Sequence, residues 1–578
     1  MEKSSKTNES FTKNNKFFIP IISIIIYICA ALLITLGVKA ALGNQNKEEN
    51  VMIWNNPGEE SYFNGKYDIA ITEFTSLQEK ENWPSYMVSI AKIQSIQGNY
   101  IKSNDSLQKA YENRNKVIDT KSSEIENIQE KDIDLASQIV FTYFLNGEYK
   151  KALEYGEFYL SIYPEDSKLQ QTMFTIYLSN NENDKAKDLV ENYNLDDENS
   201  EDLVSLAQMN FIIGNYDTGL DLLSEAWNVD EDSLKIFDAV EQVSNQTKLL
   251  DKAVKAQEKN KNKEFYKAIL AKIYSLNESK KEKALTLIEE LKNDNVESAN
   301  IELLEYSVLK DESDEEAENI IDILKDKYDE TTFVGNYVRS IESYNNKKYD
   351  DAFKYAKKCI AIDREYNGTY YFIKQIKEAQ QKPEGAEPFI IDSMYNETYN
   401  YNAIIKTAEY YKNVVKDSNK SIHYYELAGC VNQKDADIFY NIGLIQINNQ
   451  RIDEAITSIK KSISINGNVA NYYRTLGCIY LDKKEKEKSI DYIRKAYSLD
   501  ENDILTLNDA AYYYAMIDNN IDRAMTNIKS AYKGINDKTK ENHKKIITDN
   551  YNRIKVTFDS SKKDSSSKTK VSELKLIY

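Results

Sequence analysis

The stretch "NGEYKKALEYGEFYLSIYP", from Asn146 to Pro164, recurs in altered form along this sequence and decides its fold. Two related stretches are "NGKYDIAITEFTSLQEKENWP", which starts at Asn64, and "GNYDTGLDLLSEAWNVD", which starts at Gly214. Each has a Gly, a Tyr two residues later and a small residue three after that. Apolar or small residues then follow at every third or fourth position, the spacing of one face of a helix.

The pattern returns at a fixed period. Its Gly lies at Gly65, Gly98, Gly147 and Gly214, and Asn181 occupies the place where a fifth is expected. The successive spacings are 33, 49, 34 and 33 residues, and the longest contains an insertion around residues 118–132. A constant period in this range is typical of a repeat array and not of a single globular core.

Each unit has the same internal order. A first helix of about 14 residues, such as the one containing "FYNIGLIQINNQ" from Phe439, is followed by a short turn. Gly or Asn suits that turn because both tolerate positive φ. A second helix then presents a small residue where it crosses the first, since a larger side chain would push the two helices apart. These positions hold Ala70, Ala152, Ala186, Ala253, Ala284, Ala317, Ala352, Ala455 and Ala524.

The two most regular units run from Ala436 to Asp503 and are 34 residues long each. The second contains Tyr473, Leu476, Gly477, Tyr480, Ile493 and Ala496. This pattern resembles the tetratricopeptide repeat, with one departure at Ser489, where the family has Ala. The resemblance implies an all-α solenoid of helix-turn-helix units. Unit starts are predicted near 51, 84, 133, 167, 200, 234, 265, 298, 333, 402, 436, 470 and 504.

A coiled coil is the other all-α explanation. It is not favoured, because apolar runs end every 12–15 residues at Asn, Gly, Asp or Lys and no heptad persists.

An uncharged segment precedes the array. Phe17 to Val38 contains 22 residues without a charge, and a helix of that length spans about 33 Å, enough for a bilayer core. The segment is longer than a typical signal-peptide core, and Ile28 before Cys29 does not fit a lipoprotein signal. We therefore expect an uncleaved transmembrane helix over 17–38. The Lys excess before it predicts a cytoplasmic tail over 1–16 and an extracytoplasmic C-terminal part.

The repeats are expected to fall into two blocks. The first covers 51–363 and the second covers 402–554. Between them, 364–401 is predicted to be an irregular break, because "KPEGAEPF" holds Pro383 and Pro388. The Ser- and Lys-rich tail over 555–578 is predicted to be disordered. A block starting near 389 is expected to fold independently.

Nothing in the sequence indicates catalysis. The two histidines, His423 and His543, are far apart, and none of the phosphate-loop, nucleophile-elbow, zinc-protease or paired CxxC motifs occurs. We expect no cofactor, no metal and no small-molecule substrate. The net charge of −19 disfavours a nucleic-acid partner. An enzyme with an unrecognised carboxylate site is an alternative from a different class.

The resemblance implies a concave face, lined by the first helices, that binds peptides or extended protein segments. A Lys/Asn/Arg carboxylate clamp known in the family is not present, since Tyr410, Asn471 and Thr475 occupy its positions. Most of the candidate positions are polar or amphipathic, which suits an exposed surface, although tyrosines that simply replace other packing residues remain an alternative. The partner-binding candidates are Tyr337, Tyr410, Tyr440, Asn441, Asn471, Arg474, Asn508, Asp509 and Tyr512.

These inferences predict a membrane-anchored bacterial scaffold that binds a protein or peptide partner. Its role would lie in the assembly or regulation of a cell-envelope complex, with the bilayer contacted through residues 17–38. Two alternatives stay open: an adaptor on the same anchor that faces the cytoplasm, and an envelope hydrolase.

Overall fold

A computed structural model describes residues 54–114, 125–243, 247–259, 263–310, 313–563 and 571–578. The predicted cytoplasmic tail (1–16) and transmembrane segment (17–38) lie outside these ranges. Among the helices that are described, none is both long enough and apolar enough to cross a bilayer.

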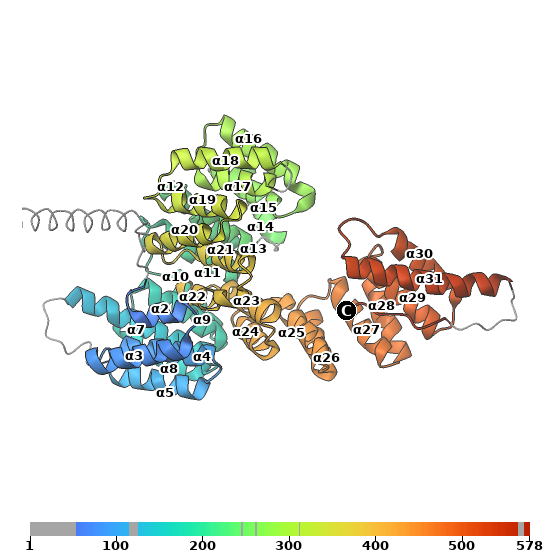
Figure 1. Cartoon of the computed structure of the whole chain (residues 1–578), viewed down its shortest axis with the longest axis horizontal. Helices are drawn as coiled ribbons and strands as arrows, with labels where there is room; N and C mark the ends of the chain where they lie inside the picture. Colours follow the sequence, from blue (N-terminus) through green and yellow to red (C-terminus); the bar gives the residue numbers. More distant parts are fainter. Residues whose placement is uncertain (1–53, 115–124, 244–246, 260–262, 311–312, 564–570) are drawn as a thin grey trace, which may run out of the picture. The chain divides into compact units, whose positions relative to one another are not determined.

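Helices follow one another as hairpins throughout the described ranges, which hold no strand (Figure 1). The first helices of the pairs are α2 (Pro57–Phe63), α4 (Pro84–Ile96), α7 (Ile125–Leu145), α9 (Ser167–Ser179), α11 (Ser200–Ile213), α13 (Lys235–Val243), α15 (Lys263–Ser275), α17 (Ala299–Leu309), α19 (Phe333–Asn345), α21 (Asn367–Ala379), α23 (Tyr401–Tyr410), α25 (Ala436–Asn448), α27 (Ala470–Asp482) and α29 (Ile504–Met516). The second helices are α3 (Tyr67–Glu81), α5 (Tyr100–Glu112), α8 (Tyr149–Ile162), α10 (Asn183–Glu191), α12 (Tyr216–Val229), α14 (Thr247–Glu258), α16 (Lys281–Asn293), α18 (Asp314–Lys327), α20 (Tyr349–Ile362), α22 (Glu387–Asn396), α24 (Ser418–Val431), α26 (Ile452–Ile465), α28 (Lys486–Leu499) and α30 (Ile521–Lys533). A final helix, α31, covers Glu541–Lys563.

The turns inside the hairpins have the backbone that the sequence predicts. Gly147 has a φ of 78°, Gly214 has 94°, and Asn181 takes the same left-handed conformation at 62°. Two later turns use side chains that the pattern did not include, because Gln450 and Lys484 have φ values of 61° and 56°. Glycine therefore marks only some of the hairpins.

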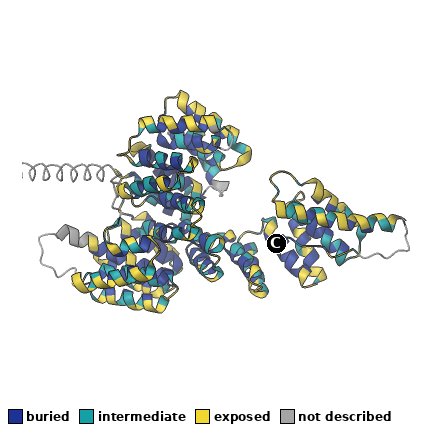
Figure 2. Ribbon diagram, in the orientation of Figure 1, coloured by how far each residue is buried: buried dark blue, intermediate teal, exposed yellow. Residues whose placement is uncertain are grey.

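Small residues sit where the paired helices cross. All nine of the predicted alanines are buried. In α25 a Cβ on Gly443 would lie 2.6 Å from Ile459 Cγ1, and in α27 a Cβ on Gly477 would lie 2.8 Å from Ile493 Cγ1. This close approach explains why the two most regular units keep glycine at that place. Buried residues lie along the surfaces where helices meet, and exposed ones on the outer surfaces (Figure 2).

The predicted irregular break over 364–401 is wrong. This segment forms another helical hairpin, in which α21 is followed by a 3₁₀ turn (Pro383–Ala386) and α22. Pro388 lies in the first turn of α22. Proline is tolerated there, because the first N–H groups of a helix have no intrahelical acceptor. The two prolines therefore start helical segments instead of ending them.

The predicted disorder over 555–578 is also wrong for the described residues. Helix α31 continues to Lys563, and the chain ends in an irregular stretch over 571–578. Leu574 and Ile577 in that stretch are each only 4% exposed.

Residues 388–399 pack on the first helices of the N-terminal repeats. The Tyr62 hydroxyl of α2 donates to Asp392, and Thr142 of α7 lies 3.0 Å from the Tyr395 hydroxyl. Further along, the Thr175 hydroxyl of α9 donates to the carbonyl of Thr398 at 2.7 Å.

Helix α24 follows and also contacts these repeats, since His423 Nε2 donates to the carbonyl of Leu145 at 2.8 Å. One hydrophobic cluster accordingly runs from Tyr62 to Ile445. The chain from α22 to α24 therefore belongs with the N-terminal repeats, and not to a separate block beginning at 389.

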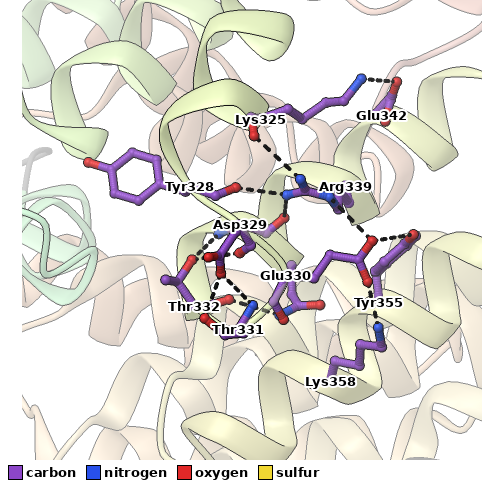
Figure 3. A network of polar contacts seen from close by, with 12 residues as sticks. Lys325, Tyr328, Asp329, Glu330, Thr331, Thr332, Arg339, Glu342, Tyr355 and Lys358 are labelled. Atoms are coloured by element: carbon purple, nitrogen blue, oxygen red, sulfur yellow. Dashed lines mark hydrogen bonds and ion pairs between the residues drawn. The ribbon is translucent and has the colours of Figure 1, made fainter. Parts of the chain in front are cut away.

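A polar network joins α18, α19 and α20 (Figure 3). Arg339 donates to the carbonyls of Tyr328, Gly335 and Lys325, at 2.9, 2.8 and 3.3 Å. It thus covers carbonyls at the end of α18 that have no partner within the helix. Glu330 lies between Arg339 and Lys358, at 3.7 and 2.8 Å. Because its charges are paired, this network stabilises the turn and offers no free ligand group.

Candidate functional site

The nine predicted binding residues do not share one accessible surface. Tyr410 is 1% exposed, and its hydroxyl donates to the carbonyls of Pro383 and Glu384 at 3.0 and 3.1 Å. It holds the 3₁₀ turn and is not available to a partner. Tyr337 is half-buried in an aromatic cluster with Tyr366 and Phe372, at centroid distances of 6.0 and 5.9 Å.

Three candidates lie on α25 and α27 with at least partial exposure. Asn471 is exposed, and Tyr440 and Asn441 are half-buried. The Tyr440 hydroxyl lies 2.9 Å from Thr475 Oγ1, and Lys412 donates to Asn441 Oδ1 at 3.1 Å. These side chains border the same first helices as the buried group described next.

The remaining candidates converge on one place. Arg474 and Asp509 are 3% and 0% exposed, so the expectation of an exposed polar surface is wrong here. Their charges are paired across α27 and α29, with Arg474 Nη1 3.3 Å from Asp509 Oδ2. Asn508 is also buried, and Tyr512 is half-buried beside it. A buried charge is tolerated only with such partners.

What covers these residues is the end of the chain itself. We call residues 571–578, "VSELKLIY", the tail; the tail site comprises Arg474, Cys478, Asn508, Asp509, Asn550 and Arg553. Figure 1 marks the C-terminus beside α27.

Backbone groups of the tail make most of its polar contacts. Arg474 Nη1 donates to the carbonyl of Ile577 at 2.6 Å, and Arg553 donates to that of Glu573. Asn550 grips Lys575 twice, because its Nδ2 donates to the Lys575 carbonyl at 2.8 Å and its Oδ1 accepts from the Lys575 N–H at 3.0 Å. The three carbonyls belong to alternate residues, the spacing at which groups of an extended chain face the same way.

Apolar side chains of the tail fill the space between helices. Leu574 and Ile577 join a cluster with Leu507 of α29 and with Ile547 and Ile554 of α31. Leu576 packs in a second cluster that contains Leu481 of α27. Ser572 and Lys575 are exposed. The tail therefore buries Leu574 and Ile577 between helices and leaves polar side chains in solvent.

Electrostatics at the tail site are dominated by burial. Burial raises the pKa of Asp509 to about 6, although the neighbouring Arg474 guanidinium acts in the opposite direction. Burial likewise raises the pKa of the Cys478 thiol, so it stays protonated and can donate to Asp509 Oδ2 at 2.9 Å. No group of three or more His, Cys, Asp or Glu arranged to hold a metal is found within the described ranges.

Sequence reasoning missed half of the tail site. Asn550 and Arg553 lie on α31, which carries no Gly-x-Tyr or crossing Ala and was not counted as a repeat. The signal was present, since Ile547, Tyr551 and Ile554 have the spacing of one helix face. The tail itself was missed because the Ser- and Lys-rich run before it led to a prediction of disorder for the whole of 555–578.

A charged cavity lies elsewhere, between the N-terminal repeats and α22. It has a volume of about 290 Å³ and is lined in part by Lys92, Lys168 and Arg364. Each of these cations has a carboxylate partner: Asp392 for Lys92, Asp134 for Lys168 at 2.8 Å, and Glu59 for Arg364 at 3.4 Å. The cavity therefore presents paired charges and no activated nucleophile.

Comparison with known proteins supports the repeat assignment. A family profile described as "Tetratricopeptide repeat" matches residues 436–469 and 470–503, and the second of these units contains Asn471 and Arg474. Residues 436–503 are tetratricopeptide repeats. The tail site is thus built partly from the second matched tetratricopeptide repeat and partly from the helices that follow it. No curated protein matches the sequence significantly.

Several solved structures are similar to this chain at low scores. The Cut9 and Hcn1 hetero-tetramer structure of the APC/C has 13% identity, covers 89% of this chain and 98% of its own, and has a TM-score of 0.32. MamA has 19% identity, coverage of 29% and 92%, and a TM-score of 0.26. YrrB, titled "a TPR protein with an unusual peptide-binding site", has 14% identity, coverage of 32% and 95%, and a TM-score of 0.26. At these scores the similarity does not bear on function.

Proposed function

We propose that this protein is a non-catalytic scaffold that binds a protein partner through an extended segment on the inner face of its C-terminal tetratricopeptide repeats. One observation carries the proposal: an eight-residue stretch packs against α27, α29 and α31, held through three backbone carbonyls and two buried apolar side chains. Stacked helical repeats present continuous faces of this kind, which suit extended ligands.

Photocrosslinking in cells that express the full chain tests this function. A photoreactive residue replaces Asn471, which is exposed on α27 beside the tail site. The matched control replaces Lys460, which is exposed on the second helix α26. We expect a discrete protein adduct from position 471, at least fivefold stronger than from position 460. Equal labelling from both positions, or none, would contradict the proposal.

We also propose that the scaffold is anchored in a cell membrane through residues 17–38, with its C-terminal part outside the cytoplasm, where it serves a cell-envelope complex. The support is the uncharged stretch and the Lys excess before it. Protease added to intact cells should then remove the repeats. Digestion only after lysis would reverse the orientation, and a mature N-terminus near Ala41 would rule out the anchor.

A further inference from the structure

We propose that the tail site is an exchangeable peptide-binding site, that the tail is its resident ligand, and that its external ligand is an extended segment of the partner with two apolar side chains three positions apart. This rests on the proposed function and names the chemistry of the partner. The tail then acts as a tethered competitor that lowers the affinity of the scaffold until the partner displaces it.

Main-chain recognition is the first argument for exchange. Asn550 pairs with both the N–H and the carbonyl of Lys575, while the side chain of Lys575 is exposed. Arg474 and Arg553 likewise donate to backbone carbonyls, those of residues 577 and 573, so these two contacts do not depend on which side chains the bound segment carries. Any extended segment can satisfy such donors, which is how strand-like peptides are bound by many domains.

Sequence selectivity comes from the buried side chains. Leu574 and Ile577 are each 4% exposed, and they lie three positions apart in the tail. Burial of an aliphatic side chain favours binding, so these two positions, together with the partly buried Leu576, decide which segments bind well. A polar residue at either position would be strongly disfavoured, whereas positions 572 and 575 tolerate polar residues in the tail itself.

The tail is an incomplete ligand for the site. Arg474 is 3% exposed, yet its Nε has no hydrogen-bond partner among the described residues. A buried donor without a partner lowers the affinity of the complex, because its bond to water is lost and not replaced. A partner segment that supplies an acceptor to this nitrogen would therefore bind better than the tail and could displace it.

The tether sets how strongly the tail competes. Only residues 564–570, "DSSSKTK", separate α31 from the tail. Because the tail and its site belong to one chain, the tail binds intramolecularly, at an effective concentration on the order of 1 mM, far above that of a dilute partner. A segment with the same intrinsic affinity as the tail is therefore outcompeted, and removal of the tail must raise its apparent affinity.

Fluorescence anisotropy with a labelled synthetic peptide of sequence VSELKLIY tests the proposal on the full chain in mild detergent. Four chains are compared: the natural chain, the chain ending at Lys570, the full chain with Ile577→Asp, and the full chain with Ser572→Asp. The last is the matched control, because it adds the same charge at an exposed tail position. Thermal melts by circular dichroism accompany each chain.

We expect the peptide to bind the truncated and Ile577→Asp chains at least tenfold more tightly than the natural and Ser572→Asp chains, with all four melts cooperative. Equal affinity for all four chains, or no binding to any, would overturn the proposal. Loss of the cooperative melt in both the truncated and the Ile577→Asp chains would overturn it too, since the tail would then be part of the folded core.

The two proposals can fail separately. If the peptide does not bind while position 471 still crosslinks a protein, the scaffold stands and the exchangeable site falls. If the peptide binds but no protein is crosslinked, the site binds only the tail of its own chain, and the proposed function is wrong.

Discussion

Left-handed backbone at the hairpin turns has a cost that depends on the residue. Gly147 and Lys484 occupy equivalent turns, with φ values of 78° and 56°. Glycine adopts this conformation freely, whereas a residue with a Cβ pays about 1–2 kcal/mol. Lys484 therefore destabilises the hairpin that positions Arg474 and Cys478, relative to the same hairpin with glycine at position 484.

We predict that Lys484→Gly raises the free energy of unfolding by about 0.5–1 kcal/mol and that Gly147→Ala lowers it by at least as much. Urea unfolding followed by circular dichroism measures both. A Lys484→Gly chain that is less stable than the natural one would show that the lysine side chain contributes more than its backbone costs.

Arg339 illustrates a residue whose fork geometry matters more than its charge. Its guanidinium reaches two carbonyls at the end of α18, those of Lys325 and Tyr328, and a third in the first turn of α19, that of Gly335 (Figure 3). We predict that Arg339→Lys lowers the free energy of unfolding by about 1–2 kcal/mol, because an ammonium cannot reach all three. Lys358→Ala, which removes only the surface ion pair with Glu330, should cost less than about 1 kcal/mol. Equal losses would mean that the ion pairs, and not the carbonyl contacts, dominate; unfolding in urea decides.

Helix α24 carries a buried histidine, so its docking on the N-terminal repeats is expected to depend on pH. His423 donates to the Leu145 carbonyl and stacks on Tyr100 at a centroid distance of 5.1 Å. Burial lowers the pKa of His423 below its ordinary value of 6.5. The unfolded chain therefore binds a proton more readily than the folded one, and stability contributed by the neutral ring is lost as pH falls below 6.5.

We predict that the difference in unfolding free energy between the natural chain and His423→Gln shrinks between pH 7.5 and pH 5. Melts at several pH values, with both chains in the same buffers, measure this difference. A constant difference across that range would show that the imidazole does not change its protonation on unfolding.

Elements were predictable from sequence where their chemistry is local. The crossing alanines and the Gly-x-Tyr turns identified most hairpins, because a helix crossing needs a small residue whatever surrounds it. Helix α22 was missed because proline breaks a helix in its interior but is tolerated in its first turn, where Pro388 lies. The sequence showed that Arg474 and Asp509 are polar, but it could not show that they are buried. The burial of Arg474 involves Ile577, about 100 residues later in the chain.

On the scale of the whole molecule, the array divides later than the prolines suggest. Residues from α22 to α24, and those of α25 up to Ile445, share a hydrophobic cluster with the N-terminal repeats, whereas the clusters built mainly from the last units are separate. A fragment that begins at 389 would expose the faces of α22 and α24 that contact α7 and α9.

We predict that a fragment over 436–578 is monomeric and melts cooperatively, whereas one over 389–578 aggregates or melts broadly. Circular dichroism and size-exclusion chromatography distinguish the two outcomes. A longer fragment that is monomeric and melts at a higher temperature would place the boundary back near 389.

The central claim is that the tail occupies the tail site as an exchangeable peptide. Hydrogen exchange of the intact chain tests this claim most directly. The Lys575 N–H donates to Asn550 at 3.0 Å, so fragments covering 571–578 should exchange at least tenfold more slowly than an unstructured peptide. Unlabelled VSELKLIY at concentrations well above the tail's effective concentration of about 1 mM should reduce that protection while α27 and α31 stay protected. A tail that exchanges at the unstructured rate in the natural chain would contradict the account.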